Sequence, residues 1–111
     1  MAIDDVQVID GMGIDRERKA ICLLISDHFA WKDDDSLSEY DHLMLLQEKI
    51  NAYISYLESK QYEEQYPGEV FDMAVIEIHF KYDITDNCEK FLNTVQSQVG
   101  QYGISIEAHI D

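Results

Sequence analysis

Two segments of the chain repeat the pattern Glu-x-His, which places metal-binding side chains at strand spacing. The first segment contains Glu77 and His79, and the second contains Glu107 and His109. Side chains two residues apart on a strand project from the same face of a sheet. If the two strands are parallel neighbours, two imidazoles and a carboxylate come close enough to hold Zn²⁺. A solvated sheet face, on which acids and imidazoles attract each other weakly, is the interpretation that we favour, and no metal site is predicted.

Two further motifs resemble catalytic patterns but lack essential parts. Ser26-Asp27-His28 contains the residue types of a catalytic triad, but adjacent residues cannot converge as triad geometry requires. Gly11-Met12-Gly13 lacks the third glycine, the Lys-Ser/Thr ending and the following helix of a phosphate-binding loop. We interpret the first motif as a capped strand end and the second as a bend or bulge in a strand. No catalytic residue and no cofactor is predicted, and we expect the protein not to be an enzyme.

A loop before the first expected helix carries the residues best suited to contact a partner. Asp33-Asp34-Asp35 lacks the spacing and glycine of a calcium loop, and it fits a solvated acidic run before a helix N-terminus. Trp31, the only tryptophan, either packs over a helix end or serves as a binding hot spot. The predicted partner-binding residues are Asp27, His28, Trp31, Asp33, Asp34, Asp35 and His42.

The net charge of −15 on 111 residues limits the classes of partner. Nucleic acids and anionic membranes are both recognised by cationic surfaces, so neither is an expected partner. A basic protein is a better match. The chain is 46% hydrophobic, which is enough for one folded domain over residues 1–111.

Cysteine usage and hydropathy favour a cytoplasmic location. Cys22 and Cys88 have no CxxC spacing and fit free buried thiols in a reducing compartment. The first residues lack the basic and apolar regions of a signal peptide. No stretch approaches the roughly 18 consecutive apolar residues of a membrane span.

Hydrophobic periodicity predicts four strands and two helices. One helix is expected from Glu39 to Lys60, capped by Ser36 or Ser38, with its apolar stripe at steps of three and four. The apolar run Ala20–Ile25 indicates a central strand, and Asp72–Tyr82 alternates as a half-covered strand does. The remaining expected elements are a strand from Val6 toward Ile14, a turn over Asp15–Arg18, a helix that begins after Asp86 or Asn87 and ends at Gly103, and a strand over Ile104–Asp111.

This ββαβαβ order predicts a two-layer α+β (α/β) sandwich. The last strand-helix-strand unit favours a crossover between parallel strands. Both helices need an apolar surface, and one face of a four-stranded mixed sheet supplies it. We therefore expect both helices on one face.

Two stretches of the chain resemble a family of small acidic bacterial domains of unknown function. The first is the loop Ser26-Asp27-His28-Phe29-Ala30-Trp31, of the form SDHxxW, and the second is the helix from His42 to Tyr53, of the form HLxLLQxKxNxY. Lys81-Tyr82, at the end of a later strand, fits as well. The resemblance implies a bacterial cytosolic protein, similar in size and charge to immunity proteins of toxin systems, and it brings no activity or catalytic residues.

Three functions are compatible with these observations. The leading hypothesis is a non-enzymatic protein-binding module, such as an immunity or inhibitor protein for a basic toxin. The second is a small metal-binding or enzymatic domain that uses the His79/His109 face. The third is a homodimeric structural module that associates through hydrophobic area around Val75 on an open sheet face.

Overall fold

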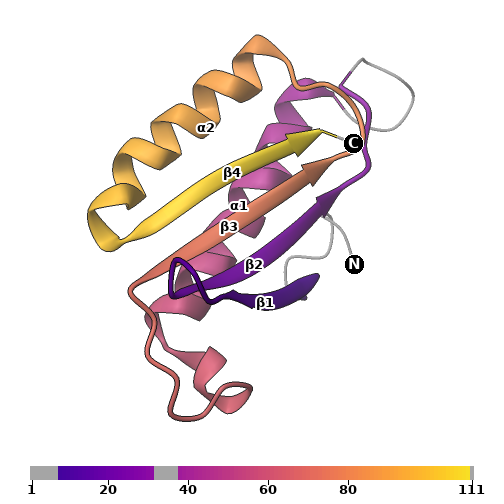
Figure 1. Cartoon of the computed structure of the whole chain (residues 1–111). Coiled ribbons are helices and arrows are strands. Elements are labelled where there is room, and N and C mark those ends of the chain that lie inside the picture. The colour runs from indigo at the N-terminus through magenta and orange to yellow at the C-terminus, as the bar shows by residue number, and fades with distance from the viewer. Residues whose placement is uncertain (1–7, 32–37, 111) are drawn as a thin grey trace.

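The computed structural model describes residues 8–31 and 38–110, and in these residues it contains four strands and two α-helices. A short 3₁₀ helix follows each α-helix (Figure 1). The elements in chain order are β1 (Gly11–Asp15), β2 (Ala20–Asp27), α1 (Glu39–Glu58), η1 (Gln61–Glu64), β3 (Met73–Phe80), α2 (Asp86–Val99), η2 (Gly100–Tyr102) and β4 (Ile104–Ile110).

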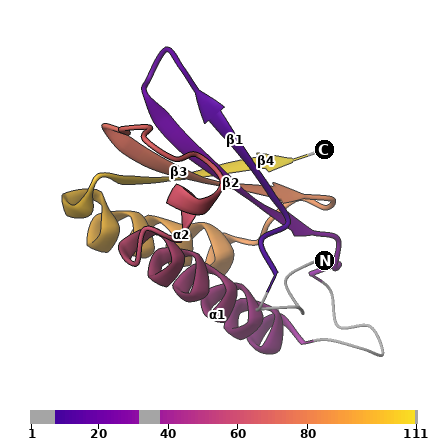
Figure 2. The ribbon, with the colours of Figure 1, turned by 90° about the horizontal axis from the view of Figure 1, so that it is seen from below.

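The strands form one mixed sheet in the order β1-β2-β3-β4. β1 pairs antiparallel with β2, whereas β2, β3 and β4 are parallel. Figure 2 shows α1 and α2 on the same side of the sheet. The predicted two-layer ββαβαβ fold is confirmed. We call the side toward the helices the covered face and the other side the open face.

The core lies between the covered face and the two helices. Every second residue of β2 and of β3 points into it, as expected of strands with one face against helices. Leu23 of β2 and Ile76 of β3, for example, are fully buried. Leu46 and Tyr53 of α1 are buried on a stripe with helical steps of three and four. The predicted apolar faces of the strands and of α1 are therefore the faces that pack.

The edge strand β1 begins later than the sequence predicts. Val8 and Ile9 lie outside the strand, which starts at Gly11. The cause is Asp10, whose carboxylate accepts a hydrogen bond from Ser26 N and whose own N–H donates to Tyr53 Oη, so the chain turns away from the sheet edge there.

The two glycines of β1 serve the sheet and not a phosphate loop. Gly11 lies against Leu24, and a Cβ at this position would stand 3.0 Å from Leu24 Cδ2. Gly13 faces open space, with no heavy atom within 4 Å of such a Cβ. The pairing of β1 with β2 is continuous from Gly11 to Asp15, so the strand is regular and the predicted bulge is absent.

The helix ends depend on local hydrogen bonds that the sequence partly indicates. Ser38 caps α1 by accepting a hydrogen bond from Asp41 N, as predicted, while Ser36 lies outside the described residues. α1 ends at Glu58, two residues before the expected end, because Lys60 adopts a left-handed conformation with φ of 58° and redirects the chain into η1. α2 begins at Asp86 and is capped by Thr85.

Charged side chains lie across the open face, which is the surface that the homodimer hypothesis uses. Val75, expected to leave hydrophobic area there, is fully buried. Arg18 donates to Asp15 of β1 and to Glu107 of β4, and it thereby links the two outer strands across this face.

Cys22 on this face and Cys88 in α2 are free thiols, as predicted. No helix in the described part of the chain is both long and apolar enough to cross a membrane.

Candidate functional site

Three of the predicted partner-binding residues converge where β2 ends. The Nε2 atom of His42 lies 2.6 Å from Asp27 Oδ2, and both side chains are completely buried. Trp31 stacks on the His42 ring at a centroid distance of 3.6 Å and an interplanar angle of 11°. The sequence did not predict that these three residues would be enclosed.

The surrounding contacts give this cluster a structural role. Asp27 Oδ1 accepts a hydrogen bond from Phe29 N, and the Asp27 carbonyl accepts one from Lys81 N, so this one residue joins β2, the following loop and the end of β3. Within the described residues, His42 Nδ1 and Trp31 Nε1 are buried without a hydrogen-bond partner. The Asp27–His42 pair thus fixes the entry of α1 against the sheet.

The remaining predicted contact residues have different surroundings. His28 is exposed and stacks on Phe29 at 4.7 Å between ring centroids. Asp33, Asp34 and Asp35 lie outside the described residues. In this structure His28 is therefore the one described member of the predicted set that is exposed enough to meet a partner directly, and the partner-binding role of the set stays a prediction.

A second buried polar cluster, missed by sequence reasoning, lies about two helical turns further along α1. Lys49 Nζ lies 3.0 Å from Asp10 Oδ1, with the Lys49 side chain fully buried and that of Asp10 3% exposed. Tyr53 Oη donates to the carbonyl of Leu24 and accepts from Asp10 N. Burial raises the pKa of the Tyr53 hydroxyl, which therefore stays a neutral donor.

The helical spacing of α1 contained the signal for this cluster. His42 and Lys49 fall at steps of four and three from Leu46, on the same stripe that carries Tyr53. A lysine on an apolar stripe is an indication that a carboxylate lies opposite it, because an unpaired buried ammonium is costly. Both clusters are enclosed, and each joins α1 to residues of the sheet or of the segment before β1.

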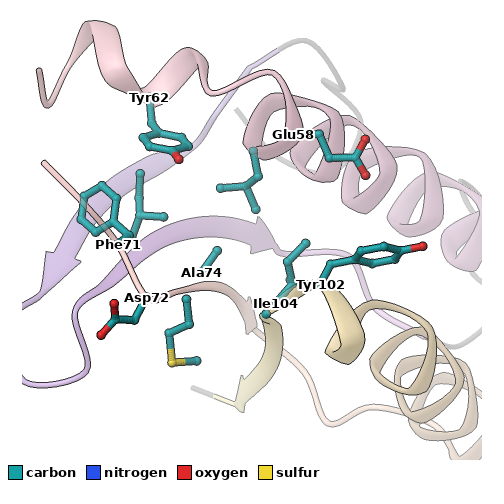
Figure 3. A pocket seen from close by; sticks show the side chains of 11 residues that line it. Glu58, Tyr62, Phe71, Asp72, Ala74, Tyr102 and Ile104 are labelled. Atoms are coloured by element: carbon teal, nitrogen blue, oxygen red, sulfur yellow. The ribbon is translucent and has the colours of Figure 1, made fainter. Parts of the chain in front are cut away.

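A pocket opens at the other end of the sheet, where the parallel strands begin. It has a volume of about 480 Å³ and lies beside the starts of β3 and β4 and the end of α1. Figure 3 shows Tyr62 and Phe71 together on one side and Tyr102 on the other. Tyr62 and Phe71 pack edge to face at 5.6 Å between ring centroids. The pocket walls are therefore largely aromatic and apolar.

Two carboxylates, Glu58 and Asp72, flank this pocket on opposite sides (Figure 3). Both residues are exposed, and so is Tyr102, which is 67% accessible to solvent. Such walls suit a long side chain with an apolar stem and a positive head, since aromatic faces and carboxylates both attract a cation. Periodicity gave no hint of the pocket, because it depends on the turn at Lys60 and on η1 and η2.

The histidines of the two Glu-x-His patterns do lie together. β3 and β4 are parallel neighbours, and their register places His79 opposite His109 and Glu77 opposite Glu107. Glu77, His79 and His109 form a group whose potential ligand atoms all lie within 4.8 Å of one another. The structure thus provides the geometric condition that the sequence left open.

Comparison with known proteins places the chain in a family but adds no activity. A family model described as a family of unknown function (DUF6572) matches residues 1–111. No curated protein and no solved structure matches the chain.

Proposed function

We propose that this chain, which belongs to the family of unknown function DUF6572, is a non-enzymatic module that binds a basic protein. The observation that carries the proposal is the aromatic pocket at the beginning of the parallel strands, which is flanked by Glu58 and Asp72 on a strongly acidic chain. An arginine or lysine of the partner would insert its apolar stem between the aromatic walls and bring its charge to the carboxylates.

The charge distribution strengthens the attraction for a basic partner. The chain has only eight Lys and Arg against 23 Asp and Glu. Two of those cations are already used internally, because Lys49 is buried beside Asp10 and Arg18 is held between Asp15 and Glu107. These internal pairs leave the net charge strongly negative, and a field of this sign accelerates the approach of a basic protein and disfavours acidic ones.

The chemistry of the thiols also fits a module without a catalytic nucleophile. Burial raises the pKa of Cys88 to about 12, and burial together with the nearby Glu77 carboxylate raises the pKa of Cys22. Both thiols are therefore protonated at neutral pH, whereas a catalytic cysteine reacts as the thiolate.

Most concretely, we propose an immunity or inhibitor protein directed against a basic toxin such as a nuclease. A nuclease holds its anionic substrate with cationic side chains, and an acidic protein that occupies those side chains would block the substrate. Trp31 is buried in this structure, so we assign the anchoring contacts to the pocket and not to the tryptophan.

The test is capture of a basic protein by the tagged chain from its native cell lysate, with elution by a salt step and a matched pair of variants. E58Q/D72N removes the two carboxylates at the pocket. E48Q/D83N removes the same number of charges at exposed positions that do not line it. We expect the wild type and E48Q/D83N to retain the same basic protein, and E58Q/D72N to bind it at least about tenfold more weakly, a loss of roughly 1.4 kcal/mol.

Two results would contradict the proposal. If the two double variants bind the captured protein equally, the pocket is not the contact. If the captured protein is acidic, or if its retention does not depend on salt, the electrostatic argument is wrong.

A further inference from the structure

We propose that the open face carries a binding site for Zn²⁺, or a similar nitrogen-preferring divalent transition metal, formed by Glu77, His79 and His109. This site is separate from the pocket that the proposed partner interaction uses. The three residues come from two neighbouring parallel strands, so the sheet itself holds them in register. A site on paired strands is positioned more rigidly than one on a loop.

The potential ligand atoms of the three residues lie close together. His79 Nε2 lies 3.3 Å from Glu77 Oε1, and His109 Nε2 lies 3.9 Å from the same oxygen. Two ligands bound tetrahedrally to zinc at about 2.0–2.1 Å are separated by about 3.3–3.4 Å. The first of the two observed separations already has this value, the second exceeds it by about half an ångström, and all three ligand atoms lie within 4.8 Å of one another.

The three residues are of the types that bind zinc in proteins. Two imidazoles with one carboxylate suit zinc and related transition metals, whereas Ca²⁺ and Mg²⁺ prefer sites built from oxygen alone. The imidazole rings lie nearly parallel, with 4.9 Å between their centroids and 19° between their planes. Rings in this arrangement can each present a nitrogen to one metal ion.

Open space lies beside two of the three residues. Glu77 and His79 also line a hollow of about 360 Å³, whose opposite wall is formed by Gly11 and Gly13 of β1. Gly13 leaves open space where any other residue would place a side chain. Three protein ligands and an accessible fourth position are the arrangement that zinc adopts where water or a small ligand completes the tetrahedron.

A chain of charged side chains adjoins the site. Glu107 Oε1 lies 3.6 Å from His109 Nε2, and Glu107 Oε2 accepts a hydrogen bond of 2.7 Å from Arg18. Arg18 is itself held by Asp15 at 2.6 Å. Glu107 thus lies beside the proposed site and is anchored through Arg18 to the far edge of the sheet.

The experiment is a titration of the purified, chelator-treated full chain with zinc chloride, followed by calorimetry in competition with a chelator of known affinity. H79A and H109A each remove one ligand, and H28A removes an exposed histidine outside the cluster as the matched control. We expect one zinc ion per chain, a loss of affinity of at least about 100-fold in H79A and in H109A, and unchanged affinity in H28A. Circular dichroism of each variant checks that it is folded.

Cobalt provides a second readout. Co²⁺ bound to the wild type should give the visible absorption of a tetrahedral site, and this absorption should disappear in H79A/H109A. Stoichiometric zinc binding that survives in folded H79A/H109A would overturn the proposal, as would the absence of a one-to-one complex in the wild type. Neither result bears on the pocket variants, so this inference and the proposed partner binding fail separately.

Discussion

The covered and open sides of the sheet carry the same two kinds of polar pair in opposite surroundings. On the covered side, His42 faces Asp27 and Lys49 faces Asp10, and each pair is almost completely buried. On the open side, two histidines face Glu77, and Arg18 bridges Asp15 and Glu107, with side chains that are 28% to 47% exposed.

This difference separates a structural role from a binding role. A buried carboxylate must keep its partner, because water cannot replace the lost interaction. A half-exposed carboxylate can exchange its partner for water or a metal ion at little cost. The same residue types therefore stabilise the fold on one side and remain available for a ligand on the other.

The largest expected effect is the loss of Lys49. Lys49→Met keeps most of the side-chain volume but leaves Asp10 as a buried charge without its cation, and we expect the free energy of unfolding to fall by about 3–5 kcal/mol. Urea denaturation followed by circular dichroism measures it. Arg18→Met, the corresponding change on the open face, should have little effect because water reaches both carboxylates.

A double variant distinguishes the lost charge pair from lost packing. Asp10→Asn combined with Lys49→Met removes both charges, and an uncharged pair of similar volume is often no less stable than a buried ion pair. We expect the double variant to recover most of the stability lost in Lys49→Met. If it is less stable than the single variant, packing and not charge explains the loss.

The next effect concerns the two kinds of histidine. His42→Ala removes a hydrogen bond to a buried carboxylate, which typically contributes about 1.5–3 kcal/mol, and it also removes the ring on which Trp31 stacks. His79→Ala, measured with a chelator present, should change stability by no more than about 0.5 kcal/mol. Trp31 is the only tryptophan, so a red shift of its fluorescence should accompany the first change and not the second.

The sequence predicted the fold well because hydrophobic periodicity determines it. The apolar positions that alternate in β3 and those that form the stripe of α1 are the positions that pack in the core. Ser38 caps its helix, as its spacing with Asp41 indicates. The errors lie where a single side chain overrides the pattern. Asp10 draws the chain away from the edge of β1, and Lys60 ends α1 early through its left-handed backbone.

The candidate sites were less predictable because they depend on long-range pairing. The cluster of Glu77, His79 and His109 depends on the register of β3 with β4, which the alternation allowed but did not fix. The burial of Asp27 and His42 is a tertiary effect, and their residue types usually favour the surface. The pocket depends on η1 and η2, which have no periodic signal.

The smallest expected effect tests the exposed charge pair on the open side through its dependence on pH. The hydrogen bond from the Arg18 guanidinium lowers the pKa of the Asp15 carboxyl below its ordinary value. As pH falls, the Asp15 carboxyl is therefore protonated in the unfolded chain before it is protonated in the folded chain. The charge pair stabilises the fold fully above the unfolded pKa of about 3.9, and this contribution is lost as pH drops through the lower pKa of the folded state.

Asp15→Asn keeps an oxygen that can accept the hydrogen bonds from Glu17 N and Arg18 N but removes the charge. Its melting temperature, followed by circular dichroism with a chelator present, should be slightly below that of the wild type at neutral pH, and the two should converge in strong acid, once the carboxyl is protonated in both states. A gap that stays constant with pH would mean that the turn and not the charge is responsible. Asp15→Asn and Lys49→Met should also be compared by their melting temperatures at neutral pH. If Asp15→Asn lowered the melting temperature as much as Lys49→Met does, an exposed charge pair would stabilise the fold as much as a buried one, and the distinction between the two sides of the sheet would be wrong.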